Sequence, residues 1–67
     1  MGDGFETPEE AALAGWPPSA LARVVRVEQK AEDRVDVIVD TDPHYLMRAQ
    51  CRRYRGLWYE EAWGNDA

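Results

Sequence analysis

A chain of 67 residues suffices for one small domain, but it buries only about 60% of its unfolded surface, which argues against a large buried catalytic cleft. Hydrophobic residues make up 45% of it and charged residues 31%, so it is too apolar to be intrinsically disordered. The formal net charge is −5, with acids and no base in residues 1–20 and arginines without acids in residues 43–59. We therefore expect an electrically polarised surface.

The expected compartment follows from the cysteine count and from the apolar runs. Cys51 is the single cysteine, so an internal disulfide cannot form and a disulfide-rich secreted scaffold is excluded. The first residues are acidic and form no apolar leader, and no apolar run approaches the roughly 20 residues that span a bilayer. These features predict a cytoplasmic protein without membrane contact. The excess of arginine over Lys30 is typical of a high-GC bacterial genome.

The first predicted element is a short helix over residues 7–15, preceded by a flexible arm at residues 1–6. Thr7 can cap the helix, Pro8 suits its first position, and Glu10 can complete a capping box. Gly15 can adopt the left-handed conformation that ends a helix, and two prolines follow it closely. An isolated helix of this length is marginal in water, so it must dock on the rest of the chain.

Residues 21–63 change to the alternating pattern of β-strands, and residues 64–67 are expected to be a frayed tail. The alternation is clearest over residues 34–41, where every second residue is valine or threonine. Turn residues divide the segment into four strands that follow one another. The sequence therefore predicts a single α+β domain over residues 1–67, with one short N-terminal helix packed on a four-stranded antiparallel β-meander.

The first two hairpins can be assigned a register. Pairing of opposite charges favours a first hairpin with Val27 opposite Val35. A three-residue turn at residues 42–44 then places Val37 opposite Ala49, so that both strands present one apolar face together.

For the last hairpin we expect a three-residue turn at residues 54–56, with glycine in the left-handed position. This turn sends Tyr59 and Trp63 to the helix face and leaves Trp58 on the outer face. It also turns Glu61 toward the apolar face, so Glu61 lies beyond the helix in solvent, or the strand has a bulge or another register there.

A helix followed by a long meander that ends in the turn Arg55-Gly56-Leu57-Trp58-Tyr59 resembles the C-terminal half of cystatin-like, SnoaL-like and nuclear-transport-factor-like α+β cones. The resemblance covers residues 7–63. It implies a ligand-binding or enzymatic pocket between helix and sheet. Those families have longer N-terminal helices, which form much of their pocket, and this chain departs from them there.

Two function hypotheses follow from the predicted shape, because one alanine-rich helix cannot cover four strands. The first is a non-enzymatic interaction module or accessory subunit that uses the uncovered apolar surface, most directly as a homodimer. Its partner-binding residues would be Trp58, Arg48, Arg52, Leu46, Ile38 and Val24. The alternative is a small-ligand pocket between helix and sheet. That pocket would be lined by Trp16, Tyr45, Tyr59 and Trp63.

Three further features have weaker functional interpretations. The arginines between residues 48 and 55, interleaved with aromatic residues, fit single-stranded nucleic-acid binding, but the acidic net charge favours ion pairing across strands instead. The acids and His44 in residues 40–44 fit a solvated turn better than a metal site. Cys51 alternates with apolar residues and is expected to be buried with a raised pKa. No catalytic residue, metal or cofactor is predicted.

Overall fold

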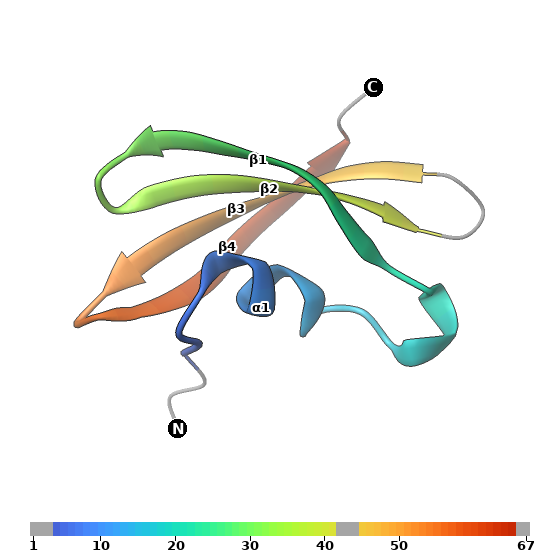
Figure 1. The fold of residues 1–67 in the computed structure, drawn as a ribbon, viewed down its shortest axis with the longest axis horizontal. Helices are drawn as coiled ribbons and strands as arrows, with labels where there is room; N and C mark the ends of the chain where they lie inside the picture. Colours follow the sequence, from blue (N-terminus) through green and yellow to red (C-terminus); the bar gives the residue numbers. More distant parts are fainter. Residues whose placement is uncertain (1–3, 42–44, 66–67) are drawn as a thin grey trace.

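The computed structural model describes residues 4–41 and 45–65, in which one short helix covers one face of a four-stranded antiparallel sheet (Figure 1). The strands lie in the order β1-β2-β3-β4, so each pairs with its neighbour in the sequence. This arrangement confirms the predicted α+β meander. The elements are α1 (Pro8–Leu13), the 3-10 turn η1 (Pro18–Ala20), β1 (Arg23–Ala31), β2 (Arg34–Thr41), β3 (Tyr45–Tyr54) and β4 (Leu57–Asn65).

Helix α1 begins with the predicted capping box. The Thr7 hydroxyl accepts a hydrogen bond from the Glu10 backbone N–H at 3.2 Å, and the Glu10 carboxylate accepts one from the Thr7 backbone N–H at 3.2 Å. The expected left-handed ending at Gly15 is wrong, because Gly15 does not have a positive φ. Among the described glycines, Gly56 has one. Gly15 instead allows close packing, since a Cβ there would lie 3.3 Å from the Trp63 ring.

The core lies between α1 and the facing side of the sheet. Ala11 and Ala12 are 3% and 0% exposed, and their small side chains let the helix backbone approach the strands closely. Because α1 lies mainly over β2, β3 and β4, strand β1 is left at the margin. The buried members of the core cluster are Ala11, Ala12, Val35, Val37, Val39, Ala49, Cys51 and Trp58.

The predicted register of the first hairpin is wrong. Val27 lies opposite Val37 rather than Val35, because the chain reverses tightly and brings Ala31 opposite Arg34. Two irregularities in β1, between Val24 and Arg26 and between Gln29 and Ala31, shift the pairing along the strand.

The register between β2 and β3 is the predicted one. Val35 lies opposite Cys51, Val37 opposite Ala49, and Thr41 opposite Tyr45. The turn at residues 42–44, including His44 and its proposed metal or turn role, lies outside the described residues.

The last hairpin closes one residue more tightly than predicted, and this reverses the faces at the start of β4. Tyr54 pairs with Leu57, so the turn contains Arg55 and Gly56, with φ angles of 55° and 83°. Positive φ at both central residues is the geometry of tight hairpin turns that match the twist of the strands.

The tight turn places Trp58 on the helix face, where it is 9% exposed, and Tyr59 opposite Arg52 on the outer face. The predicted positions of both aromatic residues are therefore wrong. A bulge at Glu61, one of the expected alternatives, restores the alternation, because Cys51 pairs with Glu60 and Gln50 with Ala62. Trp63 consequently faces the helix as predicted, opposite Ala49.

The segment before α1 pairs with the free edge of β4. The Phe5 N–H donates to the Trp58 carbonyl at 2.9 Å, and the Trp58 N–H donates to the Phe5 carbonyl at 2.7 Å. Gly4 makes this approach possible, since a Cβ there would lie 2.6 Å from the Leu57 Cβ and 2.8 Å from the Tyr59 ring. Phe5 therefore covers the edge of the sheet at Trp58.

Candidate functional site

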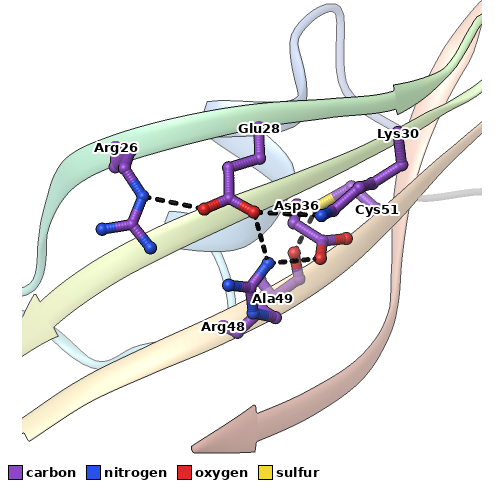
Figure 2. A network of polar contacts seen from close by, with 7 residues as sticks. All are labelled: Arg26, Glu28, Lys30, Asp36, Arg48, Ala49 and Cys51. Atoms are coloured by element: carbon purple, nitrogen blue, oxygen red, sulfur yellow. Dashed lines mark hydrogen bonds and ion pairs between the residues drawn. The ribbon is translucent and has the colours of Figure 1, made fainter. Parts of the chain in front are cut away.

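The outer face of the sheet carries an ion-pair network, shown in Figure 2. The Glu28 carboxylate lies 2.8 Å from Arg48 Nη1, 2.8 Å from Arg26 Nε and 3.1 Å from Lys30 Nζ. Arg48 Nη1 also lies 2.6 Å from Asp36 Oδ2. Hydrogen bonds from these cations, above all from Arg48, lower the pKa of Glu28 to about 2. Arg48, a predicted partner-binding residue, is thus held by two carboxylates of its own chain.

Ile38, another predicted partner-binding residue, lies opposite two arginines of this network. Ile38 points to the outer face between Arg26 on β1 and Arg48 on β3, and yet it is 0% exposed. Long arginine side chains can bury their aliphatic stems on such a residue while their charged groups remain in water. The prediction that Ile38 is available for a partner is therefore wrong.

The remaining predicted partner-binding residues do not form one patch. Trp58 is buried on the helix face, and Val24 packs partly buried against the core. Leu46 is 41% exposed, near the start of β3. Arg52 is exposed toward the other end of the same strand.

Arg52 belongs to an open groove of about 450 Å³ beside the turn that joins β3 and β4. Strand β3, strand β4 and the turn between β1 and β2 all contribute to its wall. Tyr54, at the end of β3, is 59% exposed. We call this feature the hairpin-end groove; its lining residues are Asp33, Arg52, Arg53, Tyr54, Tyr59 and Glu61.

Arginine charge is poorly neutralised around the hairpin-end groove. Arg34 on β2 lies directly opposite Arg52 on β3, although like charges in this position destabilise a sheet. Arg34 has no ion pair among the residues that the structure describes. The carboxylate near Arg52 is Glu61, at 3.5 Å, and both side chains are about half exposed. A solvent-exposed pair of this length contributes little.

The next two arginines contact aromatic rings rather than acids. Arg53 lies 5.7 Å from the centroid of the Trp58 ring, and Arg55 lies 5.3 Å from that of Tyr54. Such cation–π contacts orient a guanidinium and leave its positive charge in place. The expectation that cross-strand ion pairing neutralises the arginines therefore holds for Arg48 and weakly for Arg52, whereas Arg53 and Arg55 lie against aromatic rings instead.

The four residues of the predicted ligand pocket are not brought together. Trp16 and Trp63 pack edge to face, with ring centroids 5.1 Å apart, and Trp16 Nε1 is buried without a hydrogen-bond partner in the described residues. Tyr45 is 62% exposed, and Tyr59 lies on the outer face. A separate hollow of about 320 Å³ between α1 and β4 includes Tyr59 and is otherwise lined by Phe5, Ala11, Ala14, Gly15 and Glu60.

Cys51 has the predicted character of a buried thiol. Its Sγ lies 3.6 Å from the Pro8 carbonyl oxygen, and burial raises the pKa of the thiol to about 11. A neutral thiol is a poor nucleophile.

The described residues contain no group of three His, Cys, Asp or Glu side chains that could hold a metal ion. They also contain no helix long and apolar enough to cross a membrane.

Comparisons with family models, with curated proteins and with solved structures give no match for this chain.

Sequence reasoning did not include Arg34 in the basic surface, although a signal for it existed. The correctly predicted pairing of Val35 with Cys51 already implied that Arg34 lies opposite Arg52. Tyr54 is predicted as a turn residue and as one of the aromatic residues interleaved with the arginines, but not as part of a groove. The tight turn at Arg55 and Gly56 is what makes it the last residue of β3.

Proposed function

We propose that this chain is a small non-enzymatic interaction module that binds an acidic segment of a partner protein in the hairpin-end groove. The observation that carries the proposal is that Arg52, which lines this groove, lies directly opposite Arg34 on the next strand, and that no carboxylate is paired to Arg34 in the described residues. Two guanidinium groups on adjacent strands offer parallel donors for carboxylates. A partner carboxylate would relieve the repulsion between them.

The lining of the groove also suits a protein partner. Arginine and tyrosine are enriched at the energetic centres of protein interfaces, and Tyr54 and Tyr59 supply rigid apolar surface beside Arg52. Gly4, in the segment before α1, packs against the Tyr59 ring and so restricts the movement of that ring. An acidic segment with an intervening aliphatic or aromatic side chain would match both the charges and the rings.

Single-stranded nucleic acid is the second candidate, favoured by the same combination of arginine and aromatic residues. Two features weigh against it. The formal net charge of −5 repels a long, continuous phosphate backbone more strongly than a short acidic segment, and Asp33 and Glu61 line the groove itself. A short acidic peptide can avoid these carboxylates more easily than a continuous phosphate backbone can.

The experiment measures fluorescence anisotropy of a labelled hexaglutamate peptide titrated with the protein at low salt. A matched hexalysine peptide controls for nonspecific adhesion, and a labelled oligothymidylate represents nucleic acid. We expect the acidic peptide to bind, and the double variant Arg34→Gln/Arg52→Gln to weaken binding by about tenfold, because charge-assisted hydrogen bonds typically contribute about 1.5 to 3 kcal/mol.

The control for the loss of one positive charge is Arg23→Gln, compared with Arg34→Gln and Arg52→Gln as single variants, since Arg23 pairs with Asp40 at 3.0 Å near the other end of the sheet. This variant should bind like the wild-type protein. Stronger binding of oligothymidylate than of the acidic peptide would replace the proposal by nucleic-acid binding. Weakening by Arg23→Gln that equals the weakening by each of the single variants Arg34→Gln and Arg52→Gln would mean that net charge, and not the groove, is responsible.

A further inference from the structure

An apolar row on the helix face crosses the whole sheet and ends at its open edge. The row runs through Val37, Ala49 and Trp63, which are covered by α1 and its neighbours, and begins at Val27 on β1. Val27 is 42% exposed and the adjacent Val25 is 48% exposed. We infer that β1 pairs in antiparallel fashion with β1 of a second copy, about a two-fold axis at Val27. This inference is independent of the hairpin-end groove.

The charges of β1 select this axis. With the axis at Val27, Arg26 of each copy lies opposite Glu28 of the other, so opposite charges meet twice on the outer face. An axis at Arg26 or at Glu28 would instead place like charges opposite each other. The axis at Val27 also brings the two Val27 side chains together on the helix face and continues the apolar row into the second molecule.

The two edges of the sheet differ in availability. Edge β4 is occupied by Phe5 at Trp58, through two backbone hydrogen bonds. Edge β1 has no such segment paired to it in the described residues. An open edge with exposed β-branched residues is a template for pairing with another strand.

The irregularities in β1 limit the extent of this pairing. They lie between Val24 and Arg26 and between Gln29 and Ala31, so the regular stretch that can pair is residues 26–29, which includes Val27. Bulges of this kind prevent continued edge-to-edge growth, and a two-fold contact closes after one partner. Because the contact is smaller than a standard interface, we expect a reversible dimer with a Kd on the order of 100 µM.

The first test is sedimentation equilibrium of the full chain from about 10 µM to about 1 mM. The wild-type protein should pass from monomer to dimer over this range. Val27→Lys places two lysines face to face at the axis and should raise the Kd at least about tenfold. Leu46→Lys, an equally exposed apolar residue on β3, should leave the Kd unchanged. A wild-type monomer at the highest concentration, or equal effects of both variants, would overturn the inference.

The second test distinguishes this axis from other contacts. In Arg26→Glu both facing positions carry acids, and in Glu28→Arg both carry arginines, so each variant should repel its own copies. A mixture of the two should recover the dimer, because every facing pair is then of opposite sign. Far-ultraviolet circular dichroism checks that each variant is folded. Failure of the mixture to dimerise while both variants are folded would exclude the axis at Val27.

Discussion

Arg53 and Trp58 lie directly opposite each other across the last hairpin, with the guanidinium carbon 5.7 Å from the centroid of the indole ring. The two side chains can share the helix face because the turn between them contains only Arg55 and Gly56. A turn longer by one residue would place Trp58 on the outer face, where the sequence alone had put it.

The buried position of Trp58 changes what its removal should do. Trp58→Ala should destabilise the fold by about 3 to 5 kcal/mol, because it leaves a large cavity beside α1 and Phe5. For a domain of this size that loss approaches the whole stability. Urea unfolding followed by circular dichroism measures it, with Leu57→Ala, at a 36% exposed position, as the control. An intact fold with nearly wild-type stability would contradict the tight turn.

The cap of α1 offers a smaller and more local test. Thr7→Ala removes the hydroxyl that accepts from the Glu10 N–H at 3.2 Å, and should cost about 1 kcal/mol. Ser19→Ala is the matched control, because η1 has no side-chain cap hydrogen bond. Both values come from urea unfolding midpoints, and equal midpoints for the two variants would rule out the capping box.

Residues on both faces of β2 should be costly to truncate. Val37 faces α1 and Ile38 faces the ion-pair network, yet each is 0% exposed. Ile38→Ala should therefore cost about 2 to 5 kcal/mol, comparable with Val37→Ala, although an outer-face residue would ordinarily cost little. The exposed Val25→Ala serves as the reference for a near-neutral change. A cost for Ile38→Ala as small as that of Val25→Ala would show that the arginine stems do not bury it.

The ion-pair network predicts a pH dependence of stability. The pKa of Glu28 in the folded state is about 2, below its ordinary value of 4.5, so folding favours the charged carboxylate. The stabilisation is complete above about pH 4.5 and is lost as the pH falls through about 2. Urea unfolding at a series of pH values in this window should show a shallower loss for Glu28→Gln than for the wild-type protein. Glu32→Gln, in the exposed turn after β1, is the control; identical profiles for wild-type protein and Glu28→Gln would contradict the network.

The buried thiol should be unreactive in the folded protein. Cys51 is 2% exposed and its pKa is raised to about 11, so an aromatic disulfide reagent at pH 8 should label it at least about a hundredfold more slowly in buffer than in denaturing urea. Labelling is followed by absorbance of the released thiolate. A rapid reaction in buffer would mean that the core opens readily around Pro8 and Cys51.

Local chemistry determined the parts of the fold that were predicted correctly. The capping box depends on Thr7, the residue before α1, and on Glu10 in its first turn, which are three residues apart, and the four strands follow from alternation and turn residues. The register of β2 with β3 was also predicted, because only one turn length buries both apolar faces together. From that register, the pairing of Arg34 with Arg52 in the candidate site could have been predicted as well.

Tertiary structure decided the rest, because the alternatives differ by contacts between distant segments. Whether Trp58 or Tyr59 enters the core depends on α1 and Phe5, which are far from the last turn in the sequence. The bulge at Glu61 then reverses the alternation a second time. In β1, irregular pairing places Val27 opposite Val37 and not opposite Val35. The charge pattern within the hairpin does not reveal these irregularities. A strand has period two, so one residue gained or lost exchanges its faces, and the free energy of burying those faces is set by the whole fold.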